Sequence, residues 1–156
     1  MISAPTSRKA RESRSRETSA AATPKETLTF GWNFNQSLEE VSWPPGLQIL
    51  TFGGEFNRPE RLTWPSKLQS LTFGFRFNQS LLQVTLPDTL QSLTFGCAFD
   101  QSLDGVILPK GLRRLTFGDR FNQALEHVTW PESLERLGGK NRRPGPSTRD
   151  LLRIGP

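Results

Sequence analysis

The chain contains one cysteine and one histidine, and these two side chains are its candidates for nucleophilic catalysis. A thiol is activated when an adjacent imidazole removes its proton, which requires the two groups to lie within hydrogen-bond reach. Cys97 follows the glycine of a Leu-Thr-Phe-Gly sequence, whereas His127 precedes a valine in a later copy of the same repeat. Because the two residues lie in different copies of the repeat and at different positions within it, we expect a free thiol and a surface imidazole that do not act together in catalysis.

The residue counts also exclude other kinds of site. A single cysteine excludes an intrachain disulfide and a Cys-x-x-Cys metal site, and a single histidine excludes a multi-histidine metal site. No phosphate-binding G-x-x-x-x-G-K-[ST] loop is present. We therefore predict a protein that is not an enzyme and needs no cofactor or metal. No apolar run approaches the ~18 residues of a membrane span, and the first residues form no apolar secretory segment. An intracellular, cytoplasmic location is expected.

Acidic side chains recur at one outward position of the repeat and are candidates for partner recognition. The column consists of Glu39, Glu60, Leu82, Asp104 and Glu126. Neighbouring carboxylates about one strand apart repel each other. The column is therefore either a solvated acidic face or a site for a basic segment of a partner protein.

Two other variable columns carry candidate partner-binding residues. Trp32 and Phe75 occupy the position after the glycine of their copies, where we expect exposed aromatic side chains. Exposed aromatic residues often anchor protein interfaces. Arg113 and Arg114 stand where earlier copies have glutamine, serine or isoleucine, so positive charge rises toward the last copy and would select a partner.

The basic balance of the chain comes from its two ends. The net charge is +5, divided as +3 for residues 1–27, −2 for residues 28–137 and +4 for residues 138–156. Both ends have little to bury, so we predict disordered tails. Their candidate anion-binding residues are Arg8, Lys9, Arg11, Arg14, Arg16, Arg142 and Arg143. The alternative function is therefore binding of nucleic acid or another anionic surface through these tails.

An internal repeat fills the region between the tails. Leu-Thr-Phe-Gly occurs five times, with spacings of 22, 21, 22 and 22 residues. A helix pair takes ~33 residues, so this period favours a solenoid with short strands. The domain division is accordingly a tail over 1–27, one solenoid of five repeats over 28–137 and a second tail over 138–156.

Each repeat has two halves with the same apolar pattern. Leu93-Thr94-Phe95-Gly96 alternates as a strand does, and Val84-Thr85-Leu86-Pro87 repeats that alternation. We therefore predict a mostly β fold: a leucine-rich-repeat-like β-solenoid of five turns of ~22 residues with two short parallel strands per turn. Two columns of phenylalanine should fill its interior, and an asparagine column beside them should hydrogen-bond to the next turn.

The repeat resembles the FNIP repeat family, which is named for a Phe-Asn-Ile-Pro consensus. The matching segments are Phe34–Ser37, Phe56–Pro59, Phe77–Ser80 and Phe121–Ala124. The chain departs from the consensus because only Pro59 keeps the proline and serine or alanine replaces it in four copies. FNIP repeats are similar to leucine-rich repeats. The resemblance implies a binding solenoid without catalysis, so the predicted function is a non-enzymatic scaffold for protein–protein interaction.

Two further alternatives follow from the ends of the repeat array. The chain would be a fragment of a longer array with no independent function, because the first copy lacks its leading Leu-x-x and the last ends without a polar cap. Open solenoid ends expose strand edges, which would allow weak self-association.

The threonine column allows an ice-binding interpretation, but it is one residue wide and flanked by glutamine, serine and arginine.

Overall fold

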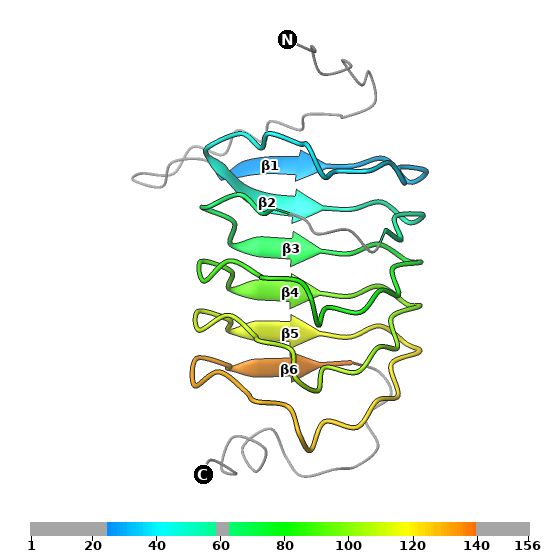
Figure 1. The fold of residues 1–156 in the computed structure, drawn as a ribbon, viewed down its shortest axis with the longest axis vertical. Coiled ribbons are helices and arrows are strands. Elements are labelled where there is room, and N and C mark those ends of the chain that lie inside the picture. Colours follow the sequence, from blue (N-terminus) through cyan, green and yellow to red (C-terminus); the bar gives the residue numbers. More distant parts are fainter. Residues whose placement is uncertain (1–24, 59–62, 140–156) are drawn as a thin grey trace.

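The computed structural model describes residues 25–58 and 63–139. Glu60 and the candidate anion-binding residues of both tails lie outside these ranges. The described residues form a solenoid in which each turn contributes one strand to a single sheet (Figure 1). The strands are β1 (Glu26–Thr29), β2 (Leu47–Thr51), β3 (Ser70–Thr72), β4 (Ser92–Thr94), β5 (Arg114–Thr116) and β6 (Arg136–Gly138).

The six strands pair in parallel and in chain order. Equivalent residues of successive repeats are register partners, as Leu71 is with Leu93 and Thr72 with Thr94. This register aligns the Leu-Thr-Phe-Gly copies one above another. The predicted leucine-rich-repeat-like β-solenoid with a parallel sheet is therefore confirmed.

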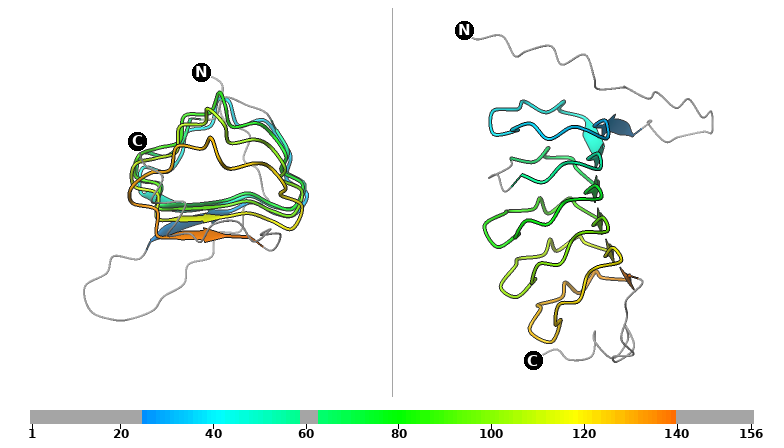
Figure 2. Two further views of the ribbon diagram at one scale, coloured as in Figure 1. Left: turned by 90° about the horizontal axis from the view of Figure 1, so that it is seen from below. Right: turned by 90° about the vertical axis from the view of Figure 1, so that its right-hand side faces the viewer.

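The rest of each repeat consists of tight turns. In the repeat that begins with β3, Phe77 N donates to Gly74 O at 3.4 Å, Val84 N to Leu81 O at 3.0 Å and Leu90 N to Pro87 O at 3.0 Å. These bonds between residues three apart form three corners, which we call the first, middle and last corner. Seen along the solenoid, the sheet makes one flat side and the corners make an arch over it (Figure 2).

The prediction of two strands per turn is wrong for the described residues. The Val-Thr-Leu-Pro half forms no strand, and all strands belong to the one sheet. Val84 N–H bonds within its own turn, and Pro87 has no N–H to offer. In the Leu-Thr-Phe-Gly half, by contrast, Phe95 N donates to Thr116 O of the next turn at 2.9 Å.

Phenylalanine rings stack through the interior in the two predicted columns. Within one turn, the rings of Phe73 and Phe77 are parallel to within 12° with centroids 3.8 Å apart. Between turns, Phe73 and Phe95 stack at 5.6 Å and Phe77 and Phe99 at 6.1 Å. The columns are buried from the second turn on, while Phe30 and Phe34 of the first turn are half-buried. The core is therefore continuous along the solenoid.

The glycine that ends each Leu-Thr-Phe-Gly copy allows neighbouring turns to approach closely. A Cβ at Gly74 would overlap the carbonyl oxygen of Gly53, and a Cβ at Gly96 would overlap that of Gly74. Gly53 and Gly118 have the same relation to the glycine one turn earlier. The requirement comes from backbone atoms, so no side-chain rotation could relieve it.

Side-chain oxygens bind the turns together beyond the first corner. From the second member on, each backbone N–H of the series donates to the side-chain oxygen of the member one turn earlier, with N···O distances of 2.8–3.0 Å; the series is Asn35, Asn57, Asn78, Asp100 and Asn122. The predicted ladder is therefore confirmed. The backbone N–H of Asn122, helped by the side-chain amide of Gln123, holds the pKa of Asp100 below its usual value.

Candidate binding surface

Trp32 and Phe75 form an exposed aromatic platform beyond the carboxyl ends of the strands. Their side chains are 61% and 46% exposed, and their ring centroids lie 6.4 Å apart. They come from turns that are separated by one intervening turn, in which Gly54 holds the equivalent position. A Cβ at Gly54 would overlap the indole of Trp32, so the absence of a side chain lets the indole lie across this turn toward Phe75. We call Trp32, Gly54 and Phe75 the aromatic platform.

Backbone and charged contacts fix the segments that carry the aromatic platform. Glu55 N donates to Trp32 O at 2.9 Å, and Arg76 N donates to Gly54 O at 2.8 Å. Beside the rings, Arg76 Nε lies 3.2 Å from Glu55 Oε1. The exposure of both aromatic residues agrees with the prediction from sequence. The contact between them across Gly54 was not predicted, because it depends on how the indole leans.

The open face of the sheet carries arginines at the starts of its last two strands. Arg113 N and Arg114 N both donate to Gln91 O at 2.9 Å, so these adjacent residues share one acceptor. The flanking leucines are buried while both arginines are exposed. Arg113 Nη1 also lies 3.0 Å from Glu135 Oε1 in an exposed ion pair.

Arg136 joins this group, although sequence analysis did not single it out. It is the register partner of Arg114 in the β5–β6 pair and is also exposed. Leu134-x-x-Leu137 repeats the spacing of Leu112-x-x-Leu115, and this was the available signal. The signal was missed because glycines replace the threonine and phenylalanine that mark the other copies. We call Arg113, Arg114 and Arg136 the arginine cluster.

The described members of the acidic column lie at the middle corner, away from the sheet. Glu39, Asp104 and Glu126 are exposed there, as is Leu82. Serine hydroxyls close these turns: Ser102 Oγ accepts a hydrogen bond from Asp104 N at 3.0 Å, and Ser80 Oγ accepts one from Leu82 N at 3.3 Å. The column therefore presents carboxylates to solvent at a corner distinct from those of the aromatic platform and the sheet.

Cys97 and His127 lie at different corners of successive repeats. Cys97 is half-buried after β4, in the column of the aromatic platform, whereas His127 is exposed at the middle corner. Within residues 25–58 and 63–139, no group of three His, Cys, Asp or Glu side chains is placed to hold a metal ion. The same part of the chain contains no helix that is long and apolar enough to cross a membrane.

Comparison with known proteins adds two findings. The family model described as FNIP Repeat matches residues 34–74, 56–98 and 99–138. Among solved structures, CroV588, described as a novel circular LRR protein structure, matches with 41% identity and a TM-score of 0.66. The alignment covers 75% of this chain and 18% of that one, so this chain spans about a fifth of the length of CroV588. No curated protein matches the chain.

Proposed function

Because the chain belongs to the FNIP repeat family, whose solenoids are typically non-enzymatic scaffolds, we propose that it binds another protein through side chains exposed on its solenoid. The observation that carries this proposal is the aromatic platform. Trp32 and Phe75 are large apolar side chains that remain open to water although the phenylalanines of the columns beside them are half-buried or buried.

Physical chemistry supports the aromatic platform as an anchor for a partner. Burying a large apolar side chain stabilises an association by about 1.5–3 kcal/mol. The two rings sit on backbone segments that are hydrogen-bonded between turns, so little flexibility is lost on binding. Two neighbouring aromatic side chains on a hydrogen-bonded backbone are suited to act as an interface hot spot.

A comparison of two double variants tests this proposal. Trp32→Ser with Phe75→Ser removes the aromatic rings, and Leu82→Ser with Ile107→Thr removes two other exposed apolar side chains, which are 55% and 86% exposed. None of these four side chains is buried in the core, so both variants should fold. Proteins captured by the wild-type chain and by each variant are then quantified by mass spectrometry.

We expect that the amount of at least one captured protein falls about tenfold or more with the Trp32/Phe75 variant. The Leu82/Ile107 variant should capture the same protein as well as the wild-type chain does. Circular dichroism should show the same β content for all three proteins. Equal retention by both variants would overturn the assignment of the aromatic platform. Capture of no protein above a bare-resin control would overturn the scaffold function itself.

A further inference from the structure

We propose that the arginine cluster is a binding site for a phosphorylated peptide segment of a partner protein. The inference rests on the proposed scaffold function and names the chemistry of a second contact. The site lies on the open face of the sheet at the amino-terminal ends of β5 and β6. It is distinct from the aromatic platform, which lies beyond the opposite ends of the strands and in earlier turns.

Two members of the arginine cluster, Arg114 and Arg136, carry like charges that face each other across neighbouring strands. Arg114 and Arg136 are register partners in neighbouring parallel strands, about 4.8 Å apart. Like charges directly opposite each other in a sheet are destabilising. Glu135 pairs with Arg113, and no carboxylate in residues 25–58 and 63–139 pairs with Arg114 or Arg136. Two positive charges therefore remain available on one small area.

The local backbone makes the cluster denser than an ordinary strand would allow. In an alternating strand, Arg113 and Arg114 would point to opposite faces. The shared acceptor Gln91 O places both on the outer side, and Arg113 O is likewise shared by Glu135 N and Arg136 N at 2.8 and 2.9 Å. Three guanidinium groups are thereby collected within two turns.

The charge of the cluster fits a phosphate monoester better than one carboxylate. A phosphorylated side chain carries about −1.5 to −2 at neutral pH and offers three acceptor oxygens. Two guanidiniums at ladder spacing can bind one such group with charge-assisted hydrogen bonds. A single carboxylate would leave one of the two arginines without a counter-charge.

The rest of the face fits a peptide better than a nucleic acid. The positions above the arginines hold Ser92 and Ser70, with a threonine column beside them, so small uncharged side chains leave room for an extended chain. Strands β2, β3 and β4 carry no lysine or arginine, so the positive charge of this face is confined to the last two turns and does not continue along a polyanion. One localised phosphate, rather than a phosphate backbone, matches this distribution.

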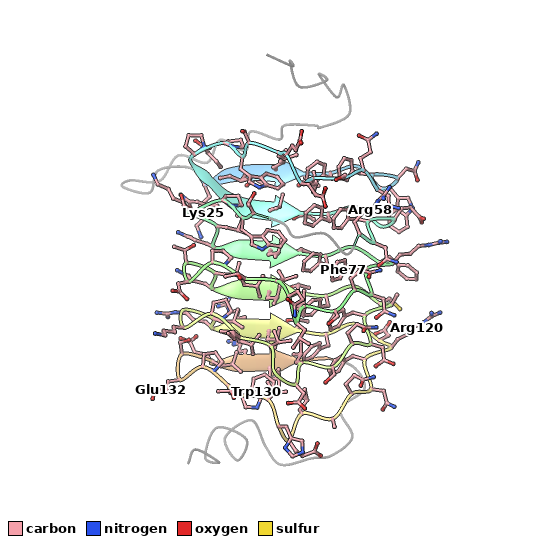
Figure 3. All side chains as sticks on the ribbon, in the orientation of Figure 1. Lys25, Arg58, Phe77, Arg120, Trp130 and Glu132 are labelled. Carbon is pink, nitrogen blue, oxygen red and sulfur yellow. The ribbon has the colours of Figure 1, made fainter. Side chains whose placement is uncertain are left out.

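Binding to peptide pools tests the proposal with the full chain. Fluorescein-labelled degenerate peptides with a fixed central phosphoserine are compared with pools carrying serine or glutamate at that position, by fluorescence polarisation at about 150 mM salt. The variant Arg114→Gln with Arg136→Gln removes the unpaired charges. Its control, Arg58→Gln with Arg120→Gln, makes the same change in net charge beyond the opposite ends of the strands (Figure 3).

We expect the phosphoserine pool to bind about tenfold more tightly than the serine pool, and this difference to vanish in the Arg114/Arg136 variant. The Arg58/Arg120 control should stay within about twofold of wild type. The Arg114/Arg136 variant should melt at the same or a higher temperature, because it removes a like-charge pair.

Several results would overturn the inference. Equal binding of phosphoserine and serine pools would exclude phosphate recognition, and equal binding of the glutamate pool would assign the cluster to acidic peptides instead. Tighter binding of single-stranded oligouridine, lost in the Arg114/Arg136 variant, would assign it to nucleic acid. The Trp32/Phe75 variant should leave phosphopeptide binding unchanged, so failure of the aromatic platform and failure of the arginine cluster can be told apart.

Discussion

The two halves of a repeat carry the same apolar alternation and fold differently. Leu93-Thr94-Phe95-Gly96 includes two of the three residues of β4, and the N–H of Phe95 binds the neighbouring turn. Val84-Thr85-Leu86-Pro87 places its apolar side chains in or against the core, but it bonds within its own turn and forms no strand. The alternation of apolar residues therefore decides which side chains are buried. The residue that ends the segment differs with the backbone hydrogen bonds: glycine ends the half that bonds to the neighbouring turn, and proline ends the half that bonds within its own turn.

Glycine and proline mark this difference at equivalent positions. Gly96 lies against the backbone of Gly74, so neighbouring turns approach closely there. Pro87 offers no N–H, but its carbonyl accepts the hydrogen bond from Leu90 N that closes the last corner. The backbone N–H groups of the sheet side thus bond between turns, whereas the backbone bond that closes the last corner lies within one turn.

The largest expected effect comes from adding one methyl group at the glycine. Gly96→Ala places a Cβ on the carbonyl oxygen of Gly74, and only a backbone shift could relieve the overlap. We expect a loss of about 4 kcal/mol or more in the free energy of unfolding. Pro87→Ala in the other half should cost about 1 kcal/mol or less, because it mainly frees the unfolded chain. Urea unfolding followed by circular dichroism measures both.

Gly139→Ala is the control for this comparison. A Cβ there would meet Phe117 Cβ at 3.5 Å, an ordinary contact, so the stability should change by less than about 0.5 kcal/mol. If Gly96→Ala lowered the free energy of unfolding as little as Gly139→Ala, the close approach of neighbouring turns would not explain why glycine recurs at this position.

Much of this fold could be predicted from sequence because each position of the repeat occurs in several copies. The phenylalanine columns and the Asn78 ladder position stand in the same register in every copy, so their role needs no three-dimensional information. The second strand could not be excluded in this way. A strand and a chain of tight turns bury the same alternate residues, and only the destination of N–H groups such as that of Val84 separates them.

The candidate site was predictable only in part, for a related reason. The exposure of Trp32 follows from its variable column, but its contact with Phe75 depends on the space that Gly54 leaves. Alternation would place Arg113 and Arg114 on opposite faces, and a shared backbone acceptor brings them to one. Side-chain columns can be read from a repeat, whereas local backbone irregularity cannot.

A smaller difference in stability is expected at the residue that follows the last interior apolar residue of each half, which is Asn78 in the strand half and Gln69 in the other half. In the strand half, Asn78 Oδ1 accepts hydrogen bonds from Asp100 N at 2.9 Å and Gln101 Nε2 at 3.0 Å. In the other half, the equivalent bond runs from Gln91 N to the backbone oxygen of Gln69 at 2.8 Å and needs no side chain.

Asn78→Ala should therefore leave the Asp100 N–H without its partner and cost about 1–2 kcal/mol of unfolding free energy. Gln69→Ala keeps the backbone acceptor and should change stability by less than about 0.5 kcal/mol. Thermal melts of the two variants give the comparison. Equal losses would mean that the Gln69 side chain also bridges the turns at this position, contrary to the backbone bond observed there.

The smallest effect concerns the one carboxylate in the amide ladder and depends on pH. Asp100 takes the place of an asparagine, and the N–H of Asn122 donates to its Oδ1 at 2.8 Å and the Gln123 amide at 3.0 Å. These bonds lower the pKa of Asp100 in the folded chain. The unfolded chain then binds the proton more readily, so the ionised carboxylate stabilises the fold above its unfolded pKa. That stabilisation is lost as the pH falls through the folded pKa.

Asp100→Asn should keep the ladder bonds, because an amide oxygen accepts from the same donors. The melting temperature of the wild-type chain should therefore fall more steeply than that of Asp100→Asn as the pH is lowered from neutral into the acid range. Asp104→Asn, an exposed member of the acidic column, controls for the change in net charge and should follow the wild-type curve. If Asp100→Asn and Asp104→Asn flattened the curve equally, general repulsion between charges would explain the pH dependence and the bonds from Asn122 and Gln123 would not.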